Sequence, residues 1–393
     1  MSRQPLRVLY VGTYEREYPR NALVIAALRR AGFDVRELHA PVWERRRDKV
    51  AGFHSPVSWL LLAATLIRAY LTLVGRTMFV LRGADVAIVG YIGQLDMLVL
   101  APLIRLLRRP VIFNPLVTLT DTLVDDRGLV GAGTRRARAV ETIDRMALAR
   151  AHAVLVDTPE NGRYLVERLG VAPRRIHQLD VGADDRMFDP NRVEPPRSDG
   201  PLQVLFYGKF TPLQGVDTIL RAAHLLDDGA FAFTLIGTGQ TCGAARALAI
   251  ELALTNVVFV DWVPYAELPG RIASADVVLG IFGDTAKAAR VVPNKVFQAM
   301  SMGAAIATAD TPAVRRVLHD ERSALLVPPA DPAELAAAIR RLADRDHRRT
   351  LGEGARAAFD EVGSIDALAR RLVEVLPAAT APYPRAEPAW VRR

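Results

Sequence analysis

The stretch that decides the fold reads Arg290-Val-Val-Pro-Asn-Lys-Val-Phe-Gln-Ala-Met-Ser-Met-Gly303. The apolar run Asp276-Val-Val-Leu-Gly-Ile-Phe282 precedes it, and a second apolar run, Ala304–Thr308, follows it. The order of strand, Pro-Asn turn, short helix, glycine stop and strand is one β-α-β step. In open parallel sheets a ligand lies at the carboxyl ends of the strands. We therefore expect the N–H groups at the start of the helix near Asn294 to bind an anion.

The same alternation runs through both halves of the chain and predicts two doubly wound parallel sheets. The strands predicted in the first half are Arg7–Val11, Asp34–Leu38, Asp85–Gly90, Val111–Asn114 and Ala153–Asp157. The helices predicted there lie near Asn21–Ala31, Ser58–Leu81, Leu95–Arg108, Arg135–Ala149 and Glu160–Leu169. The strands predicted in the second half are Val204–Tyr207, Phe231–Ile236, Val257–Val260, Val277–Ile281, Ala304–Ala307 and Ala324–Val327. The fold class is therefore α/β, with two Rossmann-like domains that face a cleft.

A polar, proline-rich bridge separates the two halves. It runs from Asp189 to Pro201 and has the composition of a linker. We expect a first domain over residues 1–188, a linker over 189–201 and a second domain over 202–376. The tail, residues 377–393, has little pattern, and we expect it to lie on the first domain or to be disordered.

Composition narrows the possible partners. The hydrophobic content of 50% and the charged content of 24% are ordinary values for a globular protein. A net charge of +8 suits nucleic acid, anionic lipid or phosphorylated substrates. The sequence shows no zinc spacing, RNP-like motif or Lys/Arg tail, so we expect no nucleic-acid partner. The single cysteine, Cys242, excludes an internal disulfide and fits a reducing cytosol.

The predicted helix Ser58–Leu81 is unusually apolar. Thr65, Arg68, Thr72 and Arg76 are three or four residues apart and share one narrow face, and most of the other side chains are apolar. A spanning helix would bury Arg68 near its centre, at a cost of roughly 2.5–3.5 kcal/mol. Simple packing on the sheet and a contact with one membrane leaflet are the two other interpretations.

A second motif, Tyr207-Gly-Lys-Phe-Thr-Pro-Leu-Gln-Gly-Val-Asp-Thr218, stands where the second half begins. Together with the stretch after Arg290 it resembles the nucleotide-sugar half of GT-B glycosyltransferases of family 4. The resemblance covers most of residues 170–360, and the first 170 residues share only the layout. It implies a retaining sugar transfer from a nucleotide-sugar donor, without a cofactor or a metal.

The resemblance also implies how the donor diphosphate is held. Gly208 and Lys209 stand where the family has a Gly-Arg pair, so Lys209 keeps the charge that neutralises the phosphate. Gln214 and Gly215 stand where the family has Lys-Gly, so a cation is lost there. We expect Gly208, Lys209 and Gln214 to contact the donor, and Lys209 to be one of two catalytic residues.

The family's two glutamates, seven residues apart, correspond to Arg290 and Gln298. An amide can both donate to and accept from a ribose hydroxyl, so Gln298 keeps that role in principle. The change to Arg290 reverses the charge, and Lys287, Arg290 and Lys295 together could replace the cation lost at Gln214. The further donor-binding candidates are Asn294, Gly237, Gly283 and Thr285.

In the first half, Gly12 ends the first strand where relatives approach the diphosphate or the acceptor. The charged run that follows makes Arg16 and Arg20 acceptor-side candidates. Relatives often place a His or Asp after the fourth strand, and Asp121 is the acid found there, which makes it the second catalytic candidate. Asp157 is its rival.

These expectations combine into one function with two alternatives. The predicted enzyme moves a sugar to a membrane- or lipid-linked saccharide, since the helix Ser58–Leu81 and the basic cluster Arg45–Lys49 suit an anionic membrane. We expect it in the cytoplasm, peripheral on the inner face of the membrane. The alternatives are a nucleotide-sugar epimerase or hydrolase of the same fold, and a non-catalytic nucleotide-binding partner of a transferase.

Overall fold

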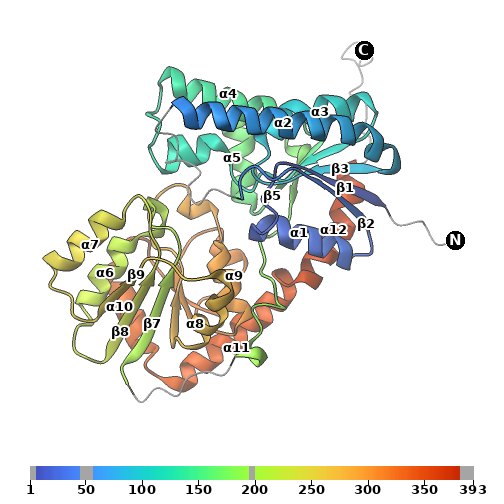
Figure 1. Ribbon diagram of the computed structural model, residues 1–393. Coiled ribbons are helices and arrows are strands. Elements are labelled where there is room, and N and C mark those ends of the chain that lie inside the picture. Colours follow the sequence, from blue (N-terminus) through green and yellow to red (C-terminus); the bar gives the residue numbers. More distant parts are fainter. Residues whose placement is uncertain (1–5, 45–55, 194–199, 381–393) are drawn as a thin grey trace, which may run out of the picture.

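The computed structural model describes residues 6–44, 56–193 and 200–380. The predicted basic cluster Arg45–Lys49, the middle of the predicted linker and the tail after residue 380 lie outside the described residues. Within the described part, Figure 1 shows two α/β bodies, each built on a six-stranded parallel sheet. The predicted fold class is therefore confirmed.

The first sheet has the strand order β2-β1-β3-β4-β5-β6. Its strands are β1 (Arg7–Gly12), β2 (Asp34–His39), β3 (Val86–Val89), β4 (Val111–Phe113), β5 (Ala153–Val156) and β6 (Ile176–Gln178). Its helices are α1 (Pro19–Arg30), α2 (Pro56–Val80), α3 (Gln94–Leu106), α4 (Arg135–Arg150) and α5 (Pro159–Leu169). The order along the sheet reverses between β1 and β3, so the ligand-binding switch point of this domain lies at Gly12 and Gly90.

The second sheet has the strand order β12-β11-β10-β7-β8-β9. Its strands are β7 (Leu202–Tyr207), β8 (Phe231–Ile236), β9 (Val257–Val260), β10 (Val277–Leu279), β11 (Ile306–Ala309) and β12 (Leu325–Val327). Its helices are α6 (Val216–His224), α7 (Cys242–Glu251), α8 (Leu268–Ala273), α9 (Asn294–Ser301), α10 (Pro332–Arg341) and α11 (Arg345–Val362). The order reverses between β7 and β10. The motif Tyr207–Thr218 begins at the carboxyl end of β7, and the motif Arg290–Gly303 lies further along the connection that follows β10.

Alternating side chains fill both faces of each sheet. In the first sheet, Leu9 and Ala87 pack on one face, while Tyr10 and Ile88 pack on the other. Strands buried on both faces carry nearly continuous apolar residues, which is why the sequence pattern located them well. The elements that the pattern did not predict include the last helix of the chain and η2, a π-helix over Thr120–Asp126 that follows β4.

A last helix returns the chain to the first domain. Helix α12 (Ile365–Thr380) packs beside α1, and Figure 1 shows it crossing from the second body to the first. Leu368, Leu372 and Leu376 are buried in the same cluster as Tyr10. The predicted end of the second domain at residue 376 therefore falls inside a helix that belongs to the core of the first domain.

Helix α2 lies on the outside of the first domain with α3 and α4 (Figure 1). Leu62 and Leu73 are buried against the core, whereas Leu71 and Phe79 are each 73% exposed. Among the described residues, one helical segment, Leu60–Gly83, is long and apolar enough to cross a membrane, and 22% of its apolar 18-residue stretch is buried. The helix therefore packs on the sheet with one side and presents apolar side chains to the outside with the other.

Candidate active site

The switch point of the second domain brings two glycine backbones into contact. Gly208 follows β7 with φ 147°, and Gly237 follows β8 with φ 144°, conformations that favour glycine. A Cβ atom on Gly237 would lie 1.9 Å from the carbonyl oxygen of Gly208. Side chains are therefore excluded at these two strand ends, which leaves backbone exposed to a ligand.

Lys295 lies buried beneath this point. Its Nζ donates to Oε1 of Gln214 at 2.6 Å and to the carbonyl oxygen of Gly280 at 3.2 Å, and it lies 3.6 Å from the ring centre of Phe206. A Cβ atom on Gly208 would lie 3.3 Å from this Nζ. The structure thus brings together Gly208, Gln214 and Lys295, three of the predicted donor-binding residues.

The surroundings of Lys295 do not neutralise its charge. Its hydrogen-bond acceptors, Gln214 and Gly280, are uncharged, and its side chain is buried. Burial holds the pKa of Lys295 well below its ordinary value, because the buried ammonium loses its hydration. An anion bound beside Lys295 would supply the missing negative charge.

Lys209 and the start of α9 complete the cationic side of the switch point. Lys209 directly follows Gly208 at the end of β7, and its side chain is exposed. Helix α9 begins at Asn294, and its N-cap residue is Pro293, which has no polar side chain to satisfy the first N–H groups. The start of α9 and the exposed Lys209 side chain thus add positive charge to this side of the switch point.

Gln298 is buried and already engaged. Its Oε1 accepts a hydrogen bond from the Tyr207 hydroxyl at 3.0 Å, and its Nε2 donates to the Tyr265 hydroxyl at 2.9 Å. Tyr265 is 40% exposed, and burial raises its pKa to about 12. The Gln298 amide therefore orients the partly exposed hydroxyl of Tyr265. The sequence analysis did not select Tyr265 as a site residue.

The loop Pro212–Gln214 packs directly on the end of β10. The N–H of Gly283 donates to the carbonyl oxygen of Leu213 at 3.2 Å, and a Cβ on Gly283 would lie 2.5 Å from the carbonyl oxygen of Pro212. The Thr285 hydroxyl accepts from the N–H of Ala288 at 3.1 Å. Gly283 and Thr285 thus have local structural partners, and their contact with a donor stays a prediction.

The two domains meet at an ion cluster built on Asp121. Its Oδ2 accepts from Lys287 Nζ at 2.8 Å, and its Oδ1 accepts from Arg290 Nη2 at 2.5 Å. Both cations lie at η7 (Ala288–Arg290) or next to it in the second domain, whereas Asp121 lies in η2 of the first. All three side chains are buried or nearly so. Asp121 therefore contacts the second domain, with each of its oxygens bound to a cation, and its catalytic role stays a prediction.

Further contacts fix Arg290 at this interface. The Thr158 hydroxyl donates to the Arg290 carbonyl oxygen at 2.6 Å, and the guanidinium lies 4.3 Å from the ring centre of Tyr164. The first domain thus contacts both the backbone carbonyl and the guanidinium of Arg290. Its predicted contact with the donor would require this arrangement to change.

At the switch point of the first domain, Asp96 holds the end of β1. Its carboxylate accepts from the N–H of Thr13 at 2.8 Å and from the Tyr70 hydroxyl of α2 at 3.0 Å. A Cβ on Gly12 would lie 2.3 Å from Asp96 Oδ2, so this glycine allows the approach. Burial raises the pKa of Asp96 to about 6. The predicted residue Gly12 is therefore linked to α2 through a carboxylate.

Arg20 does not lie on the acceptor side, and this prediction is wrong. Its side chain is fully buried, with Nε donating to Asn114 Oδ1 at 2.9 Å and Nη1 donating to the carbonyl oxygens of Leu179 and Asp180 at 2.8 and 2.7 Å. Its partners are the chain segments that follow β4 and β6. Arg20 joins these strand ends and cannot contact an acceptor.

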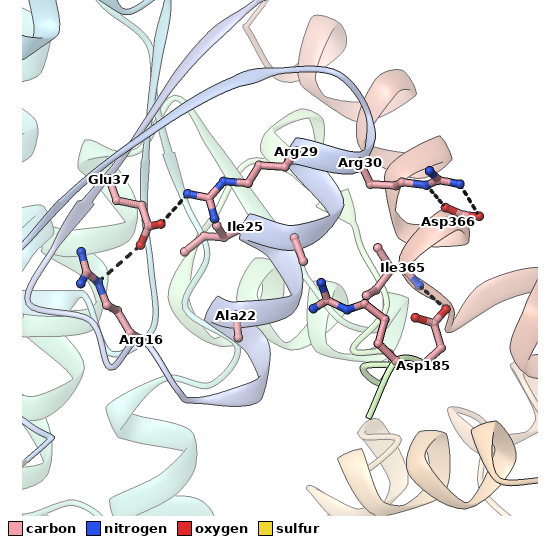
Figure 2. A pocket seen from close by; sticks show the side chains of 11 residues that line it. Arg16, Ala22, Ile25, Arg29, Arg30, Glu37, Asp185, Ile365 and Asp366 are labelled. Atoms are coloured by element: carbon pink, nitrogen blue, oxygen red, sulfur yellow. Dashed lines mark hydrogen bonds and ion pairs between the residues drawn. The ribbon is translucent and has the colours of Figure 1, made fainter. Parts of the chain in front are cut away.

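Arg16 lines a pocket that runs along α1. The pocket has a volume of 880 Å³, and Figure 2 shows Arg16 and Arg29 on either side of Glu37. The distances from Glu37 to Arg16 and Arg29 are 3.5 and 2.6 Å. Ile365, at the start of α12, lines the same pocket. Arg16 thus pairs with the carboxylate of Glu37 in β2, and its contact with an acceptor stays a prediction.

Among the described residues, no group of three or more His, Cys, Asp or Glu side chains could hold a metal ion. Metal independence stays a prediction. Asp157, the rival of Asp121, is buried and accepts from Asn161 Nδ2 at 2.6 Å at the start of α5. It is part of the turn that begins this helix, since it also accepts from the N–H of the N-cap residue Thr158 at 3.0 Å.

The second domain matches a known family. The family described as "Glycosyl transferases group 1" matches residues 201–345. A D-inositol 3-phosphate glycosyltransferase of Thermomonospora curvata is 29% identical over 265 residues, which are 59% of this chain and 58% of the relative. The protein of the same name from Geodermatophilus obscurus is 28% identical over 71% of this chain and 65% of the relative. The chain thus matches less than two thirds of the length of these relatives.

Solved structures share the whole architecture. Sucrose-phosphate synthase from Thermosynechococcus elongatus has a TM-score of 0.68 at 18% identity and covers 95% of this chain and 98% of its own. Anabaena HepE in complex with UDP-glucose has a TM-score of 0.64 at 14% identity and covers 95% of this chain and 100% of its own. The chain therefore has the GT-B fold, and residues 201–345 of its second domain match the model of the group 1 glycosyl transferases.

Proposed function

We propose that the chain is a retaining glycosyltransferase that moves a sugar from a nucleotide-sugar donor to a membrane- or lipid-linked saccharide. The family match and the names of the relatives support the transfer of a sugar. HepE, which shares the fold, was solved with UDP and with UDP-glucose, which supports a nucleotide-sugar donor.

One observation carries the donor site. Lys295 is a buried cation with uncharged partners, and it lies directly beneath the Gly208 backbone at the β7–β10 switch point. A buried charge without a counter-ion is costly, and a lysine whose pKa is strongly lowered by burial beside a ligand-binding switch point is a candidate functional residue. A diphosphate at this point would accept hydrogen bonds from Lys295, Lys209 and the first N–H groups of α9.

In this proposal the cations act on the leaving group. Breaking the bond between sugar and phosphate adds negative charge to the diphosphate, and Lys209 and Lys295 stabilise that charge without moving. The Tyr265 hydroxyl, oriented by Gln298, binds a ribose hydroxyl. In retaining enzymes of the resembled family the donor phosphate itself assists the acceptor hydroxyl, which requires no pair of flanking carboxylates.

The acceptor is proposed from helix α2. Its exposed side carries Leu60, Leu61, Ile67, Leu71 and Phe79, each between 61% and 73% exposed. The polar stripe between them is partly masked, because the hydroxyls of two threonines donate to carbonyl oxygens of the helix at 2.7 and 3.0 Å. The exposed apolar side chains would enter the membrane interface, and Arg68 and Arg76 on the same helix would attract anionic headgroups.

The test is transfer with purified protein. A panel of UDP- and GDP-hexoses is incubated with a membrane lipid extract and EDTA, and both nucleoside diphosphate and labelled lipid are followed. The proposal expects the two products in equal amounts. Diphosphate release with free sugar would indicate a hydrolase, a change of the sugar without release an epimerase, and binding without any turnover a non-catalytic partner.

A further inference from the structure

Lys287 and Arg290 hold the Asp121 carboxylate as they would hold a bound anion. Each oxygen of the carboxylate takes one cationic donor, at 2.8 Å from Lys287 and 2.5 Å from Arg290. The two cations come from one domain and the carboxylate from the other, 166 and 169 residues away along the chain (287 − 121 and 290 − 121). The cations are thus a preformed anion site whose present occupant is a side chain of the facing domain.

The site lies next to the donor position. Lys287 and Arg290 belong to the connection between β10 and α9, the same connection that begins at the switch point and leads into the anion-binding start of α9. In open α/β sheets this connection is one of the two that border the ligand. A cation pair here is in place for an oxyanion of the substrate.

The other charges around the cluster do not fill the site. Asp126 Oδ2 is 3.9 Å from Lys287, beyond hydrogen-bond distance, and Asp126 Oδ1 has no hydrogen-bond partner among the described residues. Asp125 is exposed and accepts from the Tyr164 hydroxyl at 2.7 Å. Burial raises the pKa of Asp126, which disfavours the charged form of its carboxyl group.

We infer that Lys287 and Arg290 form a binding site for a phosphate group of a substrate, and that the Asp121 carboxylate occupies this site until the phosphate displaces it. The inference rests on the proposed function and adds a second phosphate position to it. A phosphate offers the same oxygen acceptors as a carboxylate with more charge, and arginine and lysine are its usual partners.

The phosphate could come from the donor diphosphate or from a phosphorylated acceptor, since both present the same oxyanion. In either case Asp121 competes with the ligand. A site that is occupied by its own side chain in nine molecules of ten binds its ligand about 10-fold more weakly than the free site would. Removing the charge of Asp121 should therefore strengthen phosphate binding, which is the opposite of what the loss of a positioning residue does.

The experiment compares Asp121→Asn with Asp125→Asn by isothermal titration calorimetry in EDTA. The second variant removes the same charge from the same π-helix, at a residue that accepts a hydrogen bond from the Tyr164 hydroxyl and, within the described part of the chain, contacts neither Lys287 nor Arg290 in an ion pair, so it controls for the change in net charge. The probes are UDP, uridine, and glycerol 3-phosphate in the presence of saturating UDP. We expect Asp121→Asn alone to bind one of the phosphate probes about 10-fold more tightly, with no gain for uridine.

The probe that Asp121→Asn binds more tightly than the parent does identifies the source of the phosphate. A gain for UDP assigns the site to the donor, and a gain for glycerol 3-phosphate assigns it to the acceptor. Equal or weaker binding of both probes by Asp121→Asn overturns the inference, as does an equal gain in the control. If UDP still binds the parent and loses affinity in Lys295→Met, the proposed function survives that failure; if no variant binds UDP or glycerol 3-phosphate, both fall.

A second variant covers the case in which Asp121→Asn does not fold. Lys287→Met removes one cation and leaves Asp121 its bond to Arg290. We expect it to lose at least 5-fold in affinity for the phosphate probe while uridine binding is unchanged. Unchanged binding of UDP and glycerol 3-phosphate by this variant would overturn the inference on its own.

Discussion

Replacing Lys295 by methionine separates the two properties that the structure gives this residue. Methionine has a similar length and keeps the packing beneath Gly208, but it has no charge and no donor. In the free protein the ammonium bonds only to the uncharged oxygens of Gln214 and Gly280. With a diphosphate bound, the same ammonium would make a charge-assisted hydrogen bond. The variant should therefore affect binding strongly and stability weakly.

The magnitudes follow from this difference. Loss of one charge-assisted hydrogen bond costs roughly 1.5–3 kcal/mol, which weakens binding by about 10- to 150-fold. In the free protein, the variant loses the hydrogen bonds from Lys295 to Gln214 and Gly280, which lowers stability. It also no longer buries a charge, which raises stability and offsets that loss. We expect the free energy of unfolding of Lys295→Met to stay within about 1 kcal/mol of the parent at pH 7.

The pH dependence gives an independent signature. The folded-state pKa of Lys295 is lowered, so between that pKa and the unfolded value of 10.5 the unfolded chain binds more protons. The parent's stability should therefore rise with pH in this window, through the contribution of this group, and the methionine variant should lack that contribution. Denaturant unfolding at a series of pH values measures it, and calorimetry with UDP measures binding. Unchanged UDP affinity in the variant would refute the reasoning.

Three further predictions use other parts of the site. Lys209→Ala should weaken UDP binding by about 10-fold or more in calorimetry, and equal affinities would remove Lys209 from the site. In the parent, the folded-state pKa of Asp96 is raised from 3.8 to about 6, so the free energy of unfolding should fall by roughly 3 kcal/mol as the pH rises from about 4 to about 6. Asp96→Asn should lack this fall in denaturant unfolding across the same pH range. A parent whose free energy of unfolding does not fall in this range would count against a raised pKa at Asp96. Leu71→Ser with Phe79→Ser should abolish flotation with anionic vesicles at low salt, whereas Ile250→Ser, 80% exposed on the second domain, should float like the parent. If the parent itself stays at the bottom of the gradient, the membrane proposal is wrong.

The vesicle test also shows what the structure adds to the sequence. The periodicity located helix α2, but it did not say which leucines face outward. Leu62 and Leu73, which look equivalent to Leu71 in the sequence, are buried in the core. Serine at those positions would unfold the domain rather than test its surface. The side of a nearly all-apolar helix is decided by what packs on it, and this information is not local.

The strands and the switch point of the second domain followed from local pattern, because buried parallel strands are continuous apolar runs and their ends carry glycines. Helix α12 was missed although Leu368, Leu372 and Leu376 have helical spacing, since Pro377 suggested a tail. Proline is tolerated near the end of this helix, and the packing on α1 extends the helix past it.

The partners of the site residues lay beyond any local signal. Asp121 and Arg290 are complementary charges 169 residues apart, and nothing in either motif pairs them. Tyr265 acquires its role only because Gln298, 33 residues later, reaches its hydroxyl. Arg20 stands in a charged, exposed-looking run, yet its acceptors lie after β4 and β6. Sequence could name these residue types, and only the fold could say what they contact.

The central claim is that a diphosphate binds at the β7–β10 switch point between Lys209, Lys295 and the start of α9. A crystal structure of the protein with UDP, grown in EDTA, tests it most directly. We predict that the diphosphate lies against the Gly208 backbone with oxygens within hydrogen-bond distance of both lysine Nζ atoms. A diphosphate bound elsewhere, or one held at this point without a contact to Lys295, would contradict the account.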